Sequence, residues 1–391
     1  MSFVFDVPTR LLFGPDKIHA LKDESLSGKR ALLITSAGRS TIVNGSREAV
    51  IDQLQGFGIE VLLFDRIHAN PSLAVIQEAV DLARSSGCDM VVGLGGGSVM
   101  DAATAVSAVA PQTRSSVWDF VKAGTGGGYD LTEAPLFCIE IATTAGTGSE
   151  VDKIGVITNE DTHEKIGLRG FFPDLAIVDP CLMLDIPPRL TAYQGFDALF
   201  HNIEGYLSRS CNEGSAVVEL AAVRSISRYL PAAVADGKDL QARTEVALGS
   251  LLGGYSMDLS SNISHHSLEH AMSAYHPELP HGAGLILLSL SYFGFFIDHH
   301  ACDQRFIDLA RAMGRHHATE PSEFLTALRD LQVQCHVDTL KMSEHGLSAE
   351  EIPVLAENAM TAMASLFTRD PLTLSREDVV SILEDVFRLR G

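Results

Sequence analysis

Residues 89–101 read DMVVGLGGGSVMD. In this stretch a mostly apolar run, residues 89–94, is followed by three glycines and a serine at 95–98. The run over residues 89–94 predicts a buried strand, and residues 99–110 predict the helix that follows it. Glycine lets the backbone approach a phosphate closely, and the free amides at the start of a helix favour an anion. Because the turn does not read G-x-G-x-x-G, a tight strand–helix turn without a ligand stays open as the alternative.

The same alternation of strands and helices extends to both sides of this stretch. It predicts strands at 30–35, 60–64, 136–142 and 174–178, and helices at 46–55 and 72–85. Residues 154–168, with a polar turn at 159–161, predict a β-hairpin. Buried strands separated by amphipathic helices predict a parallel sheet covered on both faces, with ligands beyond the carboxyl ends of its strands.

Two further segments of this half are rich in glycine. Residues 143–150 read TTAGTGSE after a predicted strand, and they offer hydroxyls and glycines to a phosphate or a ribose. Residues 124–128 contain four glycines and predict a mobile surface loop.

The character of the chain changes at Pro187-Pro188. Beyond these prolines the apolar spacing is helical to the end, with no long alternating run typical of a strand. We therefore expect an α/β domain over residues 1–185 and an all-helical domain over residues 186–391. A chain of 391 residues is long enough for each domain to bury a core of its own.

The helical half carries a dense group of histidines. Residues 262–284 read NISHHSLEHAMSAYHPELPHGAG. His266 and His270 are four apart, so on a helix they share one face. His281 follows a predicted turn, from which its side chain can be aimed back at that face.

A second pair lies upstream, where Asp197 and His201 are also four apart. Together with His266 and His281 they would supply one oxygen and three nitrogens to a metal. That donor set suits Fe²⁺ or Zn²⁺ and excludes a Ca²⁺ or Mg²⁺ site built from oxygens. Spacing alone leaves open a helix-capping pair and a satisfied polar cluster as alternatives.

Composition excludes several classes of partner. The net charge of −21 argues against binding to nucleic acid or to an anionic membrane surface. No run approaches the roughly 20 apolar residues of a membrane span, and residues 1–14 lack the features of a signal peptide. The six cysteines show no C-x-x-C spacing, so we expect reduced thiols in a cytoplasmic protein.

Several motifs then occur together and in a fixed order. They are Pro8-Thr9-Arg10, Phe13-Gly14, Asn70-Pro71, Gly95-Gly96-Gly97-Ser98 with Asp101, residues 143–151, Ile177-Val178-Asp179-Pro180, Pro187-Pro188 and residues 195–206 (GFDALFHNIEGY). Through this set of motifs the chain resembles the iron-containing (group III) alcohol dehydrogenase family over essentially its whole length. The resemblance implies that residues 1–185 bind a dinucleotide and that residues 186–391 bind a metal.

The resemblance also implies roles for single residues. It makes Asp197, His201, His266 and His281 the metal ligands, and it makes His270 an additional active-site histidine. The positions expected to contact the dinucleotide are Ser36, Asn70, Gly96, Gly97, Ser98, Asp101, Thr143, Thr144, Thr147 and Lys165. From spacing alone, Lys165 reads as a solvated lysine of the hairpin.

The chain departs from the family's pattern in two places that bear on the site. Thr104 stands where the family often carries a lysine, and the histidine segment has one residue more between His266 and His281 than common members have. Because His265 and His266 are adjacent, either could be the first ligand of this segment. We prefer His266, since it keeps the four-residue spacing to His270.

The end of the first predicted strand, residues 30–35, bears on the choice of cofactor. NAD-preferring members of the family often have an acidic residue there, whereas residues 35–39 read TSAGR. With no carboxylate near Ser36, nothing repels a 2′-phosphate, and Arg39 could pair with it. We therefore expect NADP(H) to be used at least as well as NAD(H).

The function expected from the resemblance is hydride transfer between NAD(P)H and a small aldehyde or primary alcohol. The metal would act as a Lewis acid, and His270 would serve the proton. A zinc-dependent polyol oxidoreductase like glycerol dehydrogenase is the alternative, and a non-catalytic metal-binding or oligomer-forming module is the alternative outside enzymes. The family also implies a homodimer or a larger homo-oligomer.

Overall fold

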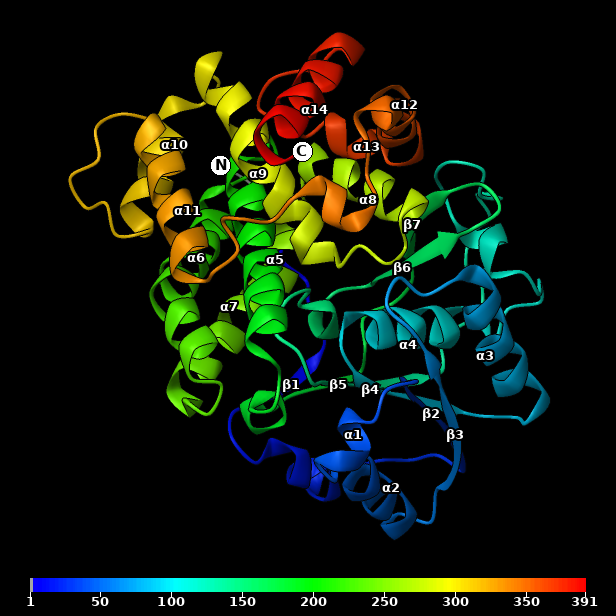
Figure 1. Cartoon of the computed structure of the whole chain (residues 1–391). Helices are drawn as coiled ribbons and strands as arrows, with labels where there is room; N and C mark the ends of the chain where they lie inside the picture. The colour runs from blue at the N-terminus through cyan, green and yellow to red at the C-terminus, as the bar shows by residue number, and fades with distance from the viewer. Residues whose placement is uncertain (1–2) are drawn as a thin grey trace. The chain divides into compact units, whose positions relative to one another are not determined.

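The N-terminal half is built on a six-stranded sheet, seen in the computed structural model of the chain, which describes residues 3–391 (Figure 1). Its strands are β1 (Arg10–Phe13), β2 (Arg30–Ser36), β3 (Glu60–Ile67), β4 (Met90–Gly95), β5 (Phe137–Ala142) and β8 (Leu175–Val178). They lie in the order β1-β8-β5-β4-β2-β3, and every neighbouring pair is parallel. The predicted parallel sheet is confirmed.

Helices cover both faces of this sheet. They are α1 (Ser40–Val43), α2 (Ser46–Gly56), α3 (Leu73–Ser85) and α4 (Gly97–Val109), with the short 3-10 helices η1 (Lys17–Asp23), η2 (Val117–Phe120), η3 (Ser149–Val151) and η4 (Pro180–Met183). In Figure 1, α3 and α4 lie on one face, and α1 and α2 lie on the other. Strand side chains such as Leu33, Val92 and Ile139 are fully buried between them, which explains why the strands read as continuous apolar runs.

The direction of the connections reverses between β2 and β4. From β2 the chain moves outward to the edge strand β3, returns across β2 to β4, and then continues the other way to β5. At such a reversal the loops leave a crevice beyond the carboxyl ends of the two strands, where α/β sheets bind ligands. Thr35 of β2 is paired with Leu94 of β4, so Ser36 and Gly95 end their strands side by side.

Strand β1 is an element that the sequence did not predict. It has only four residues, and it is defined by its register against β8, from Arg10 opposite Leu175 to Phe13 opposite Val178. Four residues are too few to show a period of two, so only the pairing with a distant segment identifies the strand.

The predicted hairpin is present as β6 (Ile154–Asn159) and β7 (Glu164–Arg169), which are antiparallel and pack on α4. The backbones approach closely at Gly155, where a Cβ would lie 2.5 Å from the carbonyl oxygen of Asp101. The glycine-rich segment 124–128 is held by hydrogen bonds: the amide of Thr125 donates to Glu164 Oε1 at 2.9 Å, and the amide of Gly127 donates to the carbonyl oxygen of Trp118 at 3.0 Å.

The C-terminal half is helical, as predicted, and within residues 3–391 no strand follows β8. Its helices are α5 (Pro188–Leu207), α6 (Glu213–Ala235), α7 (Leu240–Leu259), α8 (Ser264–Tyr275), α9 (His281–Asp298), α10 (Asp303–Ala312), α11 (Ser322–Gln334), α12 (Ile352–Ala362), α13 (Ala364–Phe367) and α14 (Arg376–Arg390), with η5 (Met342–His345) and η6 (Ala349–Glu351). Chain contacts define two compact units. One comprises residues 6–144 and 148–185, and the other comprises residues 3–5, 145–147 and 186–391.

Helix α5 lies at the centre of the helical unit and contacts α6, α7 and α9. Pro188 occupies its first turn, where a missing amide hydrogen costs nothing. Gly195 lets Leu230 of α6 approach, since a Cβ there would lie 2.2 Å from its Cδ1. Helix α9 is the only helix of the described residues that is long and apolar enough to cross a bilayer, but 72% of it is buried within the protein, as in a core helix.

Candidate metal centre

One face of α5 carries three charged or ionisable side chains into the helical unit. Asp197, His201 and Glu204 follow one another at spacings of four and three residues, so they lie along the same helix face. All three are buried, and Glu204 is fully so. Polar side chains at such depth need partners, and these come from α8, from the residues just before it, and from α9.

Helix α8 begins beside α5 because two acidic side chains from elsewhere in the chain take up its first amides. Ile263, at its N-cap position, has no side chain that could cap the helix, but its amide donates to Glu204 Oε2 at 3.1 Å. The amide of Ser264 donates to Asp370 Oδ1 at 2.9 Å. These tertiary caps fix the first turn of α8, which carries His265 and His266.

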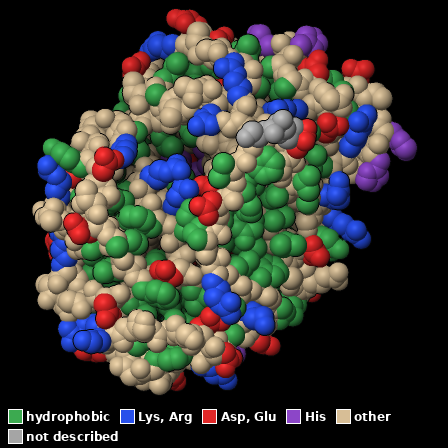
Figure 2. All heavy atoms as spheres, turned by 180° about the vertical axis from the view of Figure 1, so that it is seen from behind, with side chains coloured by type: hydrophobic (Ala, Val, Ile, Leu, Met, Phe, Trp, Pro, Cys, Tyr) green, Lys and Arg blue, Asp and Glu red, His purple; other side chains and the backbone are tan. Residues whose placement is uncertain are grey.

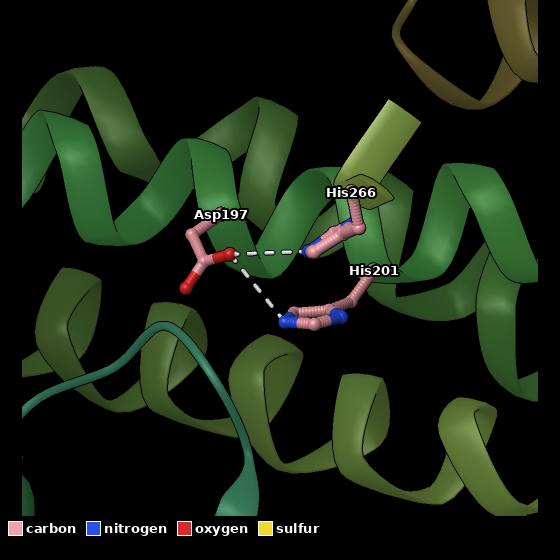
Figure 3. A group of neighbouring side chains, drawn as sticks. All are labelled: Asp197, His201 and His266. Carbon is pink, nitrogen blue, oxygen red and sulfur yellow. Dashed lines mark ion pairs between the residues drawn. The ribbon is translucent and has the colours of Figure 1, made fainter. Parts of the chain in front are cut away.

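Three imidazoles converge on one carboxylate oxygen at this point. The Nε2 atoms of His201, His281 and His266 lie 3.4, 3.5 and 3.6 Å from Asp197 Oδ1. Figure 3 shows His201 and His266 directed at Asp197. These separations are too long for good hydrogen bonds, and Asp197 Oδ1 and His266 Nε2 are buried without a hydrogen-bond partner.

The spacing of these atoms fits a transition-metal ion. Nitrogen and oxygen ligands bind Zn²⁺ at 2.0–2.2 Å in a tetrahedron, whose ligand atoms are then about 3.4 Å apart. The ligand atoms of Asp197, His201 and His266 all lie within 4.8 Å of one another. His281 completes a donor set of three nitrogens and one oxygen, which suits Fe²⁺ or Zn²⁺.

The second nitrogen of each of these three rings donates to a nearby oxygen. Nδ1 of His266 donates to Glu204 Oε1 at 2.6 Å, and Nδ1 of His281 donates to Glu269 Oε2. Nδ1 of His201 donates to the side-chain oxygen of Asn262 at 3.2 Å. Carboxylate and amide oxygens can only accept, so each ring carries a proton on Nδ1, which leaves Nε2 as the nitrogen that can ligate a metal at the centre.

Sequence reasoning did not identify Glu204, Asn262 or Glu269. Glu204 could have been found from the sequence, since its spacing extends the helix face of Asp197 and His201 by one turn of α5. Glu269 lies three residues after His266, so helical spacing places the two near one face of α8. Asn262 lies outside any helix, and no spacing in the sequence points to it.

His265 faces away from the convergence point. Its Nδ1 donates to Glu204 Oε1 at 2.8 Å, and its Nε2 lies 3.0 Å from the carbonyl oxygen of Leu285. Both ring nitrogens are therefore engaged by groups away from Asp197. Tyr292 stacks on it with a centroid distance of 5.0 Å. These contacts leave His266 as the member of the pair that is directed at Asp197.

The electrostatics of the cluster attract positive charge. Burial by itself raises the pKa of Asp197, but His201 and His281 outweigh it and hold that pKa at about 2. Burial lowers the pKa of His266, but Glu204 and Asp197 reverse the effect and raise it to about 10. Three buried carboxylates, Asp197, Glu204 and Glu269, surround these imidazoles, so the cluster favours a divalent cation.

His270 and His276, the other two histidines of this segment, differ in their surroundings. His270 is buried, and its ring centroid lies 6.4 Å from that of His266 and 5.5 Å from that of His281. His276 is instead half-buried at the end of α8, with its Nε2 2.8 Å from Glu351 Oε1. His270 therefore borders the convergence point, while His276 ties α8 to η6.

Several of the residues expected at the dinucleotide lie at the carboxyl edge of the sheet. Ser36 ends β2, and Gly96, Gly97 and Ser98 connect β4 to the first turn of α4. The amide of Thr143 donates to the carbonyl oxygen of Gly95 at 2.8 Å, which aligns the end of β5 with that of β4.

Close contacts extend this edge. A Cβ on Gly96 would lie 3.0 Å from Cγ2 of Thr144, so the glycine makes room for the threonine.

The other expected residues of the α/β unit differ in backbone conformation and burial. Asn70 has a positive φ of 51°. Asp101 on α4 and Lys165 on β7 are both buried, and Lys165 is only 5% exposed, contrary to the solvated position that its spacing predicts.

Thr147 is placed differently from the rest of the expected set. Residues 145–147 belong to the helical unit, where a Cβ on Gly146 would lie 3.0 Å from Asp197 Oδ2. The segment that follows β5 therefore passes directly over the carboxylate on which the three imidazoles converge.

The departure at Thr104 has a counterpart in the sheet. Thr104 donates to Oε1 of Glu140 at 2.8 Å, in the middle of β5, where Glu140 is fully buried and its Oε2 has no hydrogen-bond partner. Burial raises the pKa of Glu140 well above its ordinary value, which favours the neutral form of the carboxyl group.

Two family models and a number of known proteins match the chain. The model of the iron-containing alcohol dehydrogenases covers residues 8–180, and the model of the C-terminal part of the Fe-containing alcohol dehydrogenase family covers residues 191–387. The 1,3-propanediol dehydrogenase of Klebsiella pneumoniae is 32% identical over 319 residues, which are 80% of this chain and 79% of that protein.

Solved structures agree over nearly the whole length. An archaeal halo-thermophilic alcohol dehydrogenase from a Red Sea brine pool has a TM-score of 0.93 and 30% identity, with 99% of both chains covered. The sulfoacetaldehyde reductase of Bifidobacterium kashiwanohense, in complex with NAD⁺, has a TM-score of 0.84 and 26% identity, also with 99% of both chains covered.

Proposed function

The chain belongs to the iron-containing alcohol dehydrogenase family, and from this premise we propose that it holds Fe²⁺ through Asp197, His201, His266 and His281. It is an oxidoreductase that transfers hydride between a nicotinamide dinucleotide and a small alcohol or aldehyde. The proposed site rests on one observation, the convergence of three imidazole Nε2 atoms on the buried Asp197 Oδ1. Because the matching family models are those of the iron-containing alcohol dehydrogenases, a zinc-dependent polyol oxidoreductase is not favoured.

The residues of the chain divide the work of this reaction. A bound divalent ion supplies a Lewis acid that polarises the substrate oxygen. Glu204, Glu269 and Asn262 hold the three imidazoles in the ligating tautomer. His270, one turn after His266 on the same helix, is the side chain that holds and passes the proton.

The dinucleotide has a place of its own in the α/β unit. Ser36, Gly96, Gly97 and Ser98 lie where the strand connections reverse, and the amides at the start of α4 suit a pyrophosphate. Bound there, the dinucleotide supplies the hydride. Since Ser36 is not acidic and Arg39 beside it is exposed, a 2′-phosphate meets no repulsion, and we propose that NADP(H) and NAD(H) are both accepted.

Assembly and location are further parts of the proposal. Figure 2 shows apolar side chains gathered on one face of the molecule. Phe3, Val4, Phe5 and Val217 are at least half exposed, with Phe3 against Gly214 of α6 and Phe5 against Tyr255 of α7. Apolar surface of this kind supports a homo-oligomer, a dimer or larger.

All six cysteines are free thiols, which supports a cytoplasmic location.

The decisive experiment is a panel of small aldehydes and primary alcohols, assayed with NADH and NADPH on metal-free, iron-loaded and zinc-loaded protein. We expect an aldehyde to oxidise the reduced cofactor only when metal is present, with iron at least as effective as zinc. Cofactor oxidation that is equal without metal would contradict the metal-dependent mechanism. No turnover of any substrate by the loaded protein would favour a non-catalytic metal-binding module.

A further inference from the structure

Two of the three imidazoles that converge on Asp197 are held by carboxylates, and the third by an amide. Glu204 from α5 holds His266, and Asn262 holds His201. Glu269 from α8 holds His281, the residue that begins α9. His281 is thus held by a residue outside its own helix.

The position of His281 makes this contact important. Its side chain is 22% exposed, against 3% for His266 and 6% for His201. His281 is therefore at the open side of the cluster, where packing restrains a ring least. His281 is also the first residue of α9 and follows Pro280 at the N-cap, so no preceding helical turn packs against its side chain.

The surroundings of Glu269 are shaped to hold its side chain in place. Glu269 is fully buried on α8, and Gly284 of α9 faces it: a Cβ there would lie 2.8 Å from its Cγ and 3.0 Å from its Oε1. Any larger residue at 284 would push the carboxylate away from His281. The first turn of α9 also carries a partial positive charge, which suits a carboxylate at this spot.

We infer that Glu269 is a positioning residue that holds His281 in ligating orientation and tautomer, and thereby sets the affinity of the site for its metal. The inference rests on the proposed function, because it takes His281 as a ligand. Its carboxylate acts through the ring and does not itself touch the metal. Loss of such an outer partner weakens metal binding by roughly 10- to 100-fold.

Two substitutions separate the hydrogen bond from packing. Glu269→Gln keeps an acceptor oxygen and the volume, whereas Glu269→Met keeps the volume and removes the acceptor. Glu278→Gln is the matched control, since Glu278 is exposed on the turn between α8 and α9. Zinc affinity is measured for each full-length protein by competition with a chelator, and the absorption spectrum of the Co²⁺-loaded protein reports the geometry of the ligands.

We expect the control to bind zinc like the wild type, Glu269→Gln to bind less tightly, and Glu269→Met to bind roughly 10- to 100-fold less tightly with an altered Co²⁺ spectrum. Equal weakening by Gln and Met would show that the acceptor oxygen at position 269 makes no difference and would overturn the inference, as would unchanged affinity in both. If Glu269→Met does not fold, Glu269→Gln decides alone, and a wild-type affinity and Co²⁺ spectrum in that variant would overturn the inference.

Two outcomes distinguish this inference from the proposed site. A wild type that binds two ions, one of which is lost in Glu269→Gln, would make Glu269 a ligand and overturn its positioning role. An Asp197→Ala variant that binds zinc as tightly as the wild type would overturn the proposed site itself, and the inference with it. If Asp197→Ala loses the metal while both Glu269 variants keep it, only the inference fails.

Discussion

Glu204 Oε1 lies 2.6 Å from Nδ1 of His266, although the two residues belong to different helices. Glu204 comes from α5, the helix that also carries Asp197 and His201. One face of α5 therefore presents two candidate ligands and also orients a third ligand that belongs to α8. This relationship makes the convergence of the site depend on the packing of α5 against α8, and its consequences can be measured.

The four proposed ligands can be tested by metal content. Asp197→Ala and His281→Ala should each reduce bound metal from about one ion per chain to a small fraction, because each removes one of four donors. Metal analysis after dialysis measures this. His276→Ala is the control, since His276 contacts Glu351 instead, and it should keep the metal. Full metal content and activity in both ligand variants would refute the site.

His270 should separate metal binding from the rate. Because its ring borders those of His266 and His281 and the four donors already fill the ligand set, His270→Ala should keep its metal. Its turnover should fall by roughly 10- to 100-fold, the low end for general acid–base help. Metal analysis and kcat on one preparation check both statements. Loss of the metal would make His270 a ligand, and an unchanged rate would remove its proton role.

The cofactor preference should respond to charge at the end of β2. NADPH should be used at least as well as NADH by the wild type, and Ser36→Asp should shift the ratio of kcat/KM values toward NADH, since the new carboxylate repels a 2′-phosphate. Ser85→Asp adds the same charge at the exposed end of α3 and should leave the ratio unchanged. A wild type with a strong preference for NADH would contradict the prediction.

Glu140 should make stability depend on pH. Its pKa is raised by burial above the ordinary 4.5, so its contribution to stability is fully present below pH 4.5 and is lost as the pH rises toward the raised pKa. The loss approaches about 1.4 kcal/mol per pH unit, because unfolding then releases one proton. Glu140→Gln should remove this slope.

Urea unfolding at pH 5, 7 and 9 measures the effect. The free energy of unfolding of Glu140→Gln, relative to the wild type, should increase with pH, whereas the exposed control Glu133→Gln should show no such trend. A difference that is constant across this range would show that Glu140 is not a buried neutral acid.

The sequence by itself determined the elements and the pairs within them. Apolar runs predicted β2, β4 and β5 because their residues are buried on both faces of a sheet, and such burial leaves a continuous apolar pattern in the chain. The pair Asp197 and His201 was visible because a helix brings residues four apart to one face, whatever surrounds it. The family was recognisable for a similar reason, since its motifs are local.

The tertiary structure alone decided what depends on segments far apart in the chain. The pairing of β1 with β8, the acceptors on Nδ1 of His201 and His266, and the tertiary caps on α8 all join residues that no local period connects. Adjacent residues on a helix point about 100° apart, but which of His265 and His266 faces Asp197 depends on how α8 is rotated against α5. That rotation is set by packing and by Glu204 and Asp370, so it could not be read from the chain.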